Sequence, residues 1–322
     1  MVERYYNLKI KPNPKAHYKT LERWEFRINV IRKFFNLPIS KITPSYYQEM
    51  FNELGKTRGR DELSRLNNLI KKAIRLAQQD DLKIKDFTLE SSDLFSQKKA
   101  KDDDLKYLKK ASDYQKIRDY LKSNLYYSYD VIEFYLYFLF ELGMRPAELM
   151  AITWKDIDFE KKNLYTYRRF NMTDFQFTDP KKGKNHEVSS KLNSVRYVPL
   201  SDTHLEVLEK LYREQKKYNQ KFGIKNIDNQ IFQHYGYING VPAHFQCNQR
   251  IKEILKELEI EPEIDHSLYV ARHTRASNLI REGIQLDSIA KVLGHTVKEL
   301  TETYAHLLKE DEDSNFDKIR NL

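Results

Sequence analysis

The chain has 322 residues, of which 40% are apolar and 32% charged, enough for two domains of ordinary size with buried cores. No stretch approaches the roughly 18 consecutive apolar residues of a membrane span, and no apolar signal region follows the first methionine, so we expect no membrane association. The single cysteine, Cys247, excludes a disulfide within the chain and fits the reducing cytoplasm, where we expect the protein to act.

Positive charge is concentrated in the N-terminal third. The net charge is +9, and residues 1–103 contain 22 Lys and Arg against 14 Asp and Glu, whereas the remaining residues are nearly balanced. A basic module joined to a balanced one is typical of a DNA clamp attached to a catalytic domain. The alternative is a lysine-rich surface that only contacts water.

Three helices are predicted in this basic third. Residues 1–15 show no period and contain two prolines, so we expect a short tail or the remnant of a trimmed segment. Apolar residues recur every three or four positions from 16 to 35 and again from 63 to 77, as in amphipathic helices. Between them a Thr-Pro pair at 43–44 provides a helix start, and Gly55 provides the stop.

A basic loop and a polar segment follow these helices. Lys56, Arg58 and Arg60 stand in a short loop beside a predicted helix N-terminus, where they can contact DNA phosphates. A solvated loop between helices explains them equally well. Residues 91–104 are polar and charged without a period, which predicts a linker between domains.

The second domain is predicted to start near residue 105, with helices over 113–122 and 130–142. The second of these is so apolar that we expect it to be a buried core helix. It ends at Gly143, and Pro146 begins a new helix. Arg145 therefore lies in the bend before a helix N-terminus, where its guanidinium and the free amides can face one phosphate.

Alternating apolar residues predict strands over 163–169 and 194–200, with a further strand possible over 186–190. Helices are expected over 205–215 and 249–258, with an irregular region between them. The turn between the strands is rich in lysine, and the residues themselves do not select one for a function: Lys181, Lys182, Lys184 and Lys191.

An arginine, a histidine and a tyrosine stand at fixed offsets near the C-terminus. Arg272 opens a predicted helix that closes at Gly283, His295 follows a Leu-Gly turn, and Tyr304 lies nine residues further on within a second helical pattern. Arginine binds a phosphate as a planar fork, histidine can donate to a non-bridging oxygen, and tyrosine can attack phosphorus. The combination suits chemistry on a phosphodiester.

These residues stand in motifs by which the chain resembles the tyrosine recombinases, or phage-type integrases. The first motif is Gly-Met-Arg-Pro-Ala-Glu-Leu at 143–149, followed by Ile-Thr-Trp-Lys-Asp-Ile-Asp at 152–158. The others are Arg-His-Thr-Arg-Ala-Ser at 272–277, Leu-Gly-His at 293–295, and Tyr304. The resemblance is specific over about residues 105–308.

The resemblance implies a mainly α fold with a small β-sheet, in which a helical core-binding (SAM-like) domain and a mixed α/β catalytic domain form a C-shaped DNA clamp. We expect the helical DNA-binding domain at 1–90, the linker at 91–104, the catalytic domain at 105–308 and a C-terminal tail at 309–322. It further implies a double-stranded DNA partner, a homo-tetramer assembled on DNA that can use this tail, and no small-molecule substrate.

The resemblance also implies roles for individual residues. Arg145, Arg272 and His295 would hold the scissile phosphate, and Tyr304 would attack it to form a 3′-phosphotyrosine with a free 5′-hydroxyl. Lys191 holds the place of the hairpin lysine of the family and would protonate the leaving 5′-oxygen. Attack by a second 5′-hydroxyl reverses the step, so no cofactor or metal is expected.

One position departs from the family pattern. The family usually has histidine three residues before the second arginine, and here that residue is Tyr269; His266 lies nearby in the sequence. Neutral tyrosine can still hydrogen-bond a phosphate but accepts a proton poorly. The departure leaves the general base open. Two alternatives to a recombinase are a non-catalytic DNA-binding protein on the same fold and an enzyme that relaxes DNA like a type IB topoisomerase.

Overall fold

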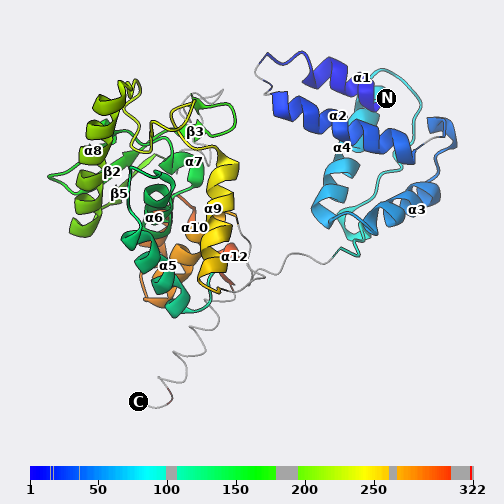
Figure 1. The fold of residues 1–322 in the computed structure, drawn as a ribbon. Helices are drawn as coiled ribbons and strands as arrows, with labels where there is room; N and C mark the ends of the chain where they lie inside the picture. The colour runs from blue at the N-terminus through cyan, green and yellow to red at the C-terminus, as the bar shows by residue number, and fades with distance from the viewer. Residues whose placement is uncertain are drawn as a thin grey trace. The chain divides into compact units, whose positions relative to one another are not determined.

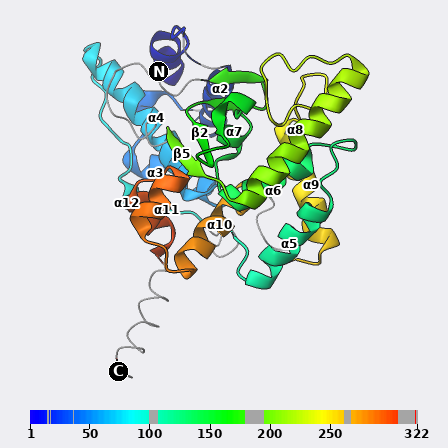
Figure 2. The same cartoon turned by 90° about the vertical axis from the view of Figure 1, so that its left-hand side faces the viewer.

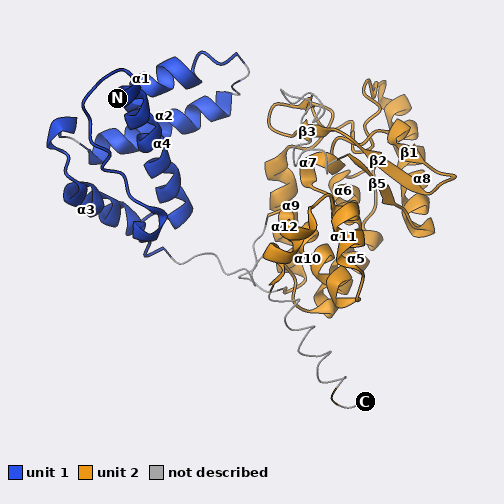
Figure 3. Cartoon of the chain, turned by 180° about the vertical axis from the view of Figure 1, so that it is seen from behind, with its two compact units in different colours: residues 1–101 blue, residues 102–322 orange. Residues whose placement is uncertain are grey.

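The computed structural model describes residues 1–14, 16, 18–35, 37–98, 107–178, 195–260, 267–305 and 320. The chain forms two compact units, Met1–Lys101 and Asp102–Leu322 (Figure 3). Each is mainly helical, and small sheets occur in the second, so the expected fold class is confirmed. The expected C-shaped clamp stays a prediction.

The first unit is a helical bundle whose helices are α1 (Val2–Tyr5), α2 (Tyr18–Phe34), α3 (Pro44–Gly55) and α4 (Arg60–Gln79) (Figure 1). Short 3-10 turns occur at Ile39–Lys41 and Ser91–Asp93. The predicted start of α3 is confirmed, because the Thr43 hydroxyl accepts a hydrogen bond from the Tyr46 amide at 3.2 Å and proline follows it.

Residues 1–14 differ from the short tail or remnant that was expected for 1–15. They form α1 and a π-helical turn, Tyr6–Ile10, and the side chains of Val2 and Tyr6 are buried in the core of the first unit. The Tyr6 ring stacks near Trp24 of α2. The prediction was wrong because two elements of four and five residues are too short to show a period.

Part of the predicted linker packs against the first unit. Leu94 is buried in its core, and the Gln97 amide donates to the Gly55 carbonyl at 2.9 Å. The Phe95 carbonyl comes so close to Gly55 that a Cβ there would meet it at 2.1 Å. Because residues 91–104 are mostly polar, the sequence did not indicate that Leu94 is buried in the core of the first unit.

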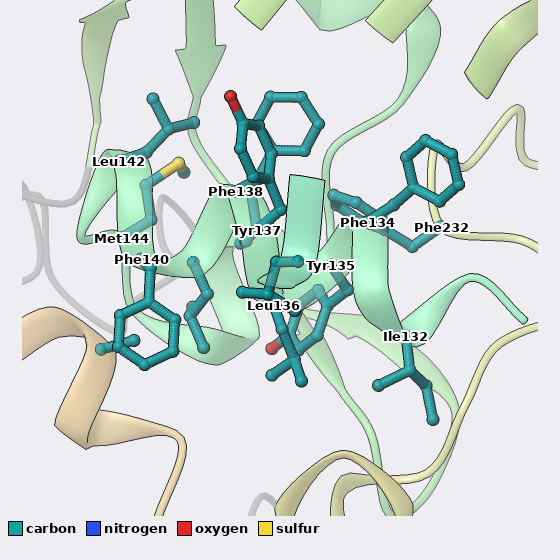
Figure 4. Packing of buried hydrophobic residues seen from close by; sticks show 14 of the residues in the cluster. Ile132, Phe134, Tyr135, Leu136, Tyr137, Phe138, Phe140, Leu142, Met144 and Phe232 are labelled. Carbon is teal, nitrogen blue, oxygen red and sulfur yellow. The ribbon is translucent and has the colours of Figure 1, made fainter. Parts of the chain in front are cut away.

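The helices of the second unit are α5 (Ala111–Ser123), α6 (Ile132–Leu142), α7 (Pro146–Leu149), α8 (Asp202–Phe222), α9 (His244–Glu257), α10 (Tyr269–Arg281), α11 (Leu286–Leu293) and α12 (Val297–Thr303) (Figure 1). α6 is the predicted core helix: its side chains are buried on every side, and they surround the helix in Figure 4. No described helix is both long and apolar enough to cross a membrane.

The described residues of the second unit also form two small antiparallel sheets. In the first the strand order is β1 (Ile157–Asp158), β2 (Asn163–Thr166), β5 (Arg196–Pro199). The second is a hairpin of β3 (Arg169–Asn171) and β4 (Gln176–Thr178), which the sequence did not predict. A short 3-10 turn, Trp154–Asp156, precedes β1. The possible strand at 186–190 lies outside the described residues.

Several helix boundaries differ from the predicted ones. α8 runs from 202 to 222 rather than 205–215, because Ser201 caps its start and a left-handed Gly223 ends it. α9 starts five residues earlier than expected, and α10 starts at Tyr269, so Arg272 lies in its first turn instead of opening it. The polar last turns of α8 carry no apolar period, which explains why its end was missed.

The burial of α6 generates a stability prediction. Leu136→Ala removes a fully buried side chain and should lower the free energy of unfolding of the second unit by about 2–5 kcal/mol. Each unit has one tryptophan, Trp24 and Trp154, so in a Trp24→Phe background Trp154 fluorescence follows the second unit alone during denaturation. The control is Tyr129→Ala, at an 83% exposed residue. Equal midpoints for the two variants would contradict the core assignment.

Candidate active site

Two arginines join separate segments of the second unit. Arg145, just before α7, donates from Nη2 to the Gly294 carbonyl at 2.8 Å, immediately before His295. Arg272, on α10, donates from Nη1 to the Gly143 carbonyl at 2.9 Å. α10 packs against α6 and α11, and α11 packs against β5 and α12; Figure 2 shows α10, α11 and α12 together. The structure therefore brings Arg145, Arg272 and His295 close together.

Two glycines make these turns possible. Gly143 after α6 and Gly294 after α11 both have left-handed φ, at 61° and 71°, which other residues rarely adopt. At Gly143 space also excludes a side chain, because a Cβ would lie 2.9 Å from Leu293 Cδ2 and 3.0 Å from Arg275 Cβ. The arginine loop and the histidine turn can therefore approach each other.

A buried carboxylate anchors the arginines. Glu148 is fully buried, and its carboxylate accepts from Arg145 Nη1 at 3.0 Å and from Arg196 Nη2 at 3.1 Å. Burial raises the pKa of Glu148, but the positive charges of Arg196, Arg145 and Arg272 outweigh it, and the pKa lies below its ordinary value. Glu148 is thus ionised at neutral pH and fixes both guanidinium groups.

Two buried nitrogen atoms of the site have no hydrogen-bond partner in the described part of the chain, Arg272 Nη2 and His295 Nδ1. Burial and the charge of Arg145 lower the pKa of Arg272 to about 9, so it remains a cation at neutral pH. Burial and the charges of Arg272 and Arg145 lower the pKa of His295 to about 3, so its imidazole is neutral. Such a positive, incompletely paired cluster of side chains suits an anion that accepts hydrogen bonds.

Tyr304 lies near Arg272 and is only 1% exposed. Its ring packs in a small apolar cluster with residues of α10 to α12, including Ala276, Leu293 and Leu300. Its hydroxyl is 2.9 Å from Nδ1 of His273. Burial raises the pKa of Tyr304 above its ordinary value, although the charge of Arg272 opposes this, so the phenol keeps its proton at neutral pH.

The position of Tyr304 corrects a prediction. It stands immediately after α12, which ends at Thr303, and not inside the helix. Thr296 fixes the start of α12 through reciprocal hydrogen bonds with Glu299, and the helix ends at Thr303, because Tyr304 leaves the helical conformation with φ −116° and ψ 24°. The apolar spacing from 300 to 308 suggested a longer helix, and residues after 305 are outside the described chain.

The remaining candidates are placed less centrally. Tyr269 is 46% exposed, and its hydroxyl makes no hydrogen bond to the part of the chain that the structure describes. It stands one helical turn before Arg272 on α10, so the two share a face. Lys191 and His266 lie outside the described residues, so their roles stay predictions.

The three basic loop residues of the first unit already have partners within that unit. Lys56 pairs with Glu53 at 2.5 Å, and Arg60 donates to the Ser91 carbonyl at 2.9 Å. Arg58 pairs with Glu62 and lies over the Phe26 ring, 5.7 Å from its centroid. Phosphate contact by this loop stays a prediction, and it would compete with these contacts.

Two site residues were not predicted, His273 and Arg196. Arg196 alternates with Val198 along β5, and this period of two could have placed it on the buried face. His273 follows Arg272 in the sequence motif, but nothing in the sequence shows its contact with Tyr304, 31 residues away. No cluster of three or more potential metal ligands occurs among the described residues.

The buried carboxylate leads to a second prediction. Glu148→Gln keeps the side-chain shape but leaves Arg196 buried without a counter-charge, which should destabilise the second unit by about 3–5 kcal/mol. Trp154 fluorescence in the Trp24→Phe background measures this during denaturation. Glu160→Gln, at an exposed position, is the matched control. A loss below about 1 kcal/mol would mean that the carboxylate does not hold the site together.

His295 generates a prediction about pH. The unfolded chain protonates this histidine below about pH 6.5, whereas the folded chain keeps it neutral down to about pH 3. Protons therefore favour the unfolded state, and stability falls as pH is lowered through this window. His295→Gln should reduce the slope by up to about 1.4 kcal/mol per pH unit between pH 6.5 and 5. Parallel stability curves for wild type and variant would contradict the assignment.

Comparisons with known proteins give the family. The sequence model of the phage integrase family matches residues 98–311. The integrase of Staphylococcus phage L54a is 26% identical, over 89% of this chain and 82% of the phage protein. The tyrosine recombinase XerC-like protein of Caldanaerobacter subterraneus and the ICEBs1 integrase of Bacillus subtilis are 24% and 28% identical, each over 57% of this chain. This chain spans about half the length of those two bacterial relatives, 47% of each.

Solved structures share the fold. The Tn1549 transposon integrase in complex with transposon right end DNA has a TM-score of 0.74 at 16% identity, over 99% of both chains. The XerH site-specific recombinase bound to palindromic difH substrate has a TM-score of 0.65 at 14% identity, over 92% of this chain and 77% of that one. The family match covers more than half of the sequence and includes Arg145, Arg272, His295 and Tyr304. This chain belongs to the phage integrase family.

Proposed function

We propose that this protein is a site-specific DNA recombinase that cuts and rejoins double-stranded DNA through a covalent 3′-phosphotyrosine. The observation that carries the proposal is the convergence of Arg145, Arg272, His295 and Tyr304 from four separate segments. Two nitrogen atoms of this group are buried without a partner among the described residues. A scissile phosphate would supply the acceptors that Arg272 Nη2 requires.

Binding of the phosphate changes the electrostatics of the site. In the free protein the neighbouring arginines keep His295 neutral. A phosphate held by Arg145 and Arg272 adds negative charge near His295 and raises its pKa. The higher pKa favours the protonated ring, which can donate to a non-bridging oxygen. The cationic groups then stabilise the crowded, highly charged transition state, which is the main source of catalysis in phosphate transfer.

Tyr304 is the proposed nucleophile. Its oxygen forms a bond to phosphorus, the bond from phosphorus to the 5′-oxygen breaks, and Lys191 protonates the leaving oxygen. A 5′-hydroxyl of a second strand then attacks phosphorus and releases Tyr304. This exchange conserves the energy of the phosphodiester, so the proposal includes no cofactor or metal. Tyr269 is proposed as a supporting residue at the phosphate, since its exposed hydroxyl can donate and accept.

The wider organisation follows the same proposal. Residues 1–90 form the helical DNA-binding domain, with Lys56, Arg58 and Arg60 at its phosphate contacts, and residues 105–308 form the catalytic domain. The excess of Lys and Arg over Asp and Glu in the N-terminal third supports this division. The working form is a homo-tetramer on two DNA sites, and the tail at 309–322 contributes to the contacts between its subunits. The protein acts on DNA in the cytoplasm.

A trapping experiment tests the proposal. The target is first selected from a random DNA pool, and a version nicked near the cleavage point is incubated with the protein, so that cleavage becomes irreversible. Wild type should form a protein–DNA adduct that survives denaturant, and Tyr304→Phe should form none, because it lacks the attacking oxygen.

Tyr269→Phe is the matched control in this assay, since it removes a phenol from the same site and should still form the adduct. Wild type that binds the selected DNA but never forms an adduct would contradict the proposal and favour a non-catalytic DNA-binding protein. An adduct with relaxation of DNA but no strand exchange between two sites would instead favour activity like that of a type IB topoisomerase.

A further inference from the structure

The contact between His273 and Tyr304 bears on one step of the proposed reaction, the removal of the proton from the Tyr304 phenol. His273 is half-buried on α10, next to Arg272, and its Nδ1 is 2.9 Å from the Tyr304 hydroxyl oxygen. The two ring centroids are 6.0 Å apart, and the planes are inclined by 57°. The contact joins a rigid helix to the residue immediately after α12, so it holds the hydroxyl at a defined place.

Attack by Tyr304 requires that its phenol lose a proton. Burial works against this loss, because it raises the pKa of the phenol. A proton acceptor within hydrogen-bond distance removes the need for a free phenolate, and general base catalysis of this kind typically contributes about 10²–10⁴-fold in rate.

The other described groups of the site do not meet this requirement. Arg145 and Arg272 are cations with no acceptor atom. Tyr269 is itself a phenol and accepts a proton poorly at neutral pH. His295 makes no hydrogen bond to Tyr304, and its pKa of about 3 makes it a weak base in the free protein.

We propose that His273 Nδ1 is the general base that accepts the phenol proton as Tyr304 attacks phosphorus. This inference rests on the proposed recombinase function. The oxygen–phosphorus bond forms as the bond to the 5′-oxygen breaks, the phenol proton moves to Nδ1, and the leaving oxygen takes a different proton from Lys191. In the reverse step His273 returns its proton to the departing tyrosine.

The arrangement makes a specific demand on the histidine. Nδ1 must carry no proton before the attack, so the neutral ring has its proton on Nε2 and accepts from the phenol. The charged and titratable groups near it include Arg272 on the same helix, His295 after α11, and Tyr304 itself. Tyr107 lies in the apolar cluster that holds the Tyr304 ring. His273 lies four residues after Tyr269 on the same helix, so this role moves the base by about one helical turn from the position where the family usually has histidine.

The test measures the rate of adduct formation on the nicked DNA as a function of pH for wild type, His273→Asn and His273→Ala. Asparagine places a polar atom near the position of Nδ1 and can keep the hydrogen bond, but it cannot take a proton. Both variants should react roughly 10²-fold or more slowly than wild type at pH 7. The rate of His273→Asn should also keep rising with pH where wild type levels off, because its phenol must lose the proton to solvent.

DNA binding and Trp154 fluorescence show that the variants are folded. A second substrate has sulfur in place of the bridging 5′-oxygen, and this leaving group needs no proton. His273→Asn should remain slow on it, because its defect is at the attacking oxygen, whereas Lys191→Ala should recover.

Three results would overturn the inference. If His273→Asn has the rate and pH profile of wild type while His273→Ala is slow, the histidine only positions Tyr304. If the sulfur substrate restores His273→Asn, the residue acts on the leaving group. If wild type itself forms no adduct, the proposed recombinase function fails. This outcome is distinct, because wild type would still form the adduct if only the role of His273 were wrong.

Discussion

The site depends on the ion pairs made by one buried carboxylate. Glu148 is shielded from water, and its two oxygens face Arg145 and Arg196 from two directions. A charge in such a place is costly unless it is paired, and here the pairs connect α7 to β5. Arg196 also donates to the Val292 carbonyl at 2.6 Å, so the same network reaches α11 and the turn that carries His295.

This network explains how several positively charged side chains can lie close together in the folded protein. The buried Glu148 carboxylate is surrounded by the guanidinium groups of four arginines, so positive charge exceeds negative charge around it: Arg145, Arg169, Arg196 and Arg272. An external anion can balance this excess. Burial and the repulsion between these positive groups lower the pKa values of Arg272 and His295. Phosphate binding would relieve the same repulsion, so strain that weakens the free protein favours the bound state.

The local placements that the sequence predicted are those that follow from short-range rules. Arg145 precedes a proline that must begin a helix, and Gly294 permits the turn before His295, so both placements follow from short-range rules. The core helix α6 was equally evident, since an apolar run of that length has no alternative to burial. The grouping of Arg145 with Arg272, His295 and Tyr304 came from the resemblance of the motifs to a family, and their roles stay predictions.

What the sequence could not supply are contacts between distant segments. Nothing local places His273 against Tyr304 or Arg196 against Glu148, because these pairs depend on how α10, α12, β5 and α7 pack. The ends of helices such as α8 were missed for a different reason, since their polar last turns have no period. The short N-terminal elements were missed because two buried side chains suffice to anchor them.

The identity of the attacking residue is the central claim, and peptide mapping of the trapped adduct tests it most directly. After digestion with protease and nuclease, mass spectrometry locates the residue that carries the nucleotide and the end of the nucleotide to which it is joined. The account predicts a nucleotide linked through its 3′-phosphate to Tyr304. Linkage to Tyr269, or to any other residue, or through a 5′-phosphate would contradict it.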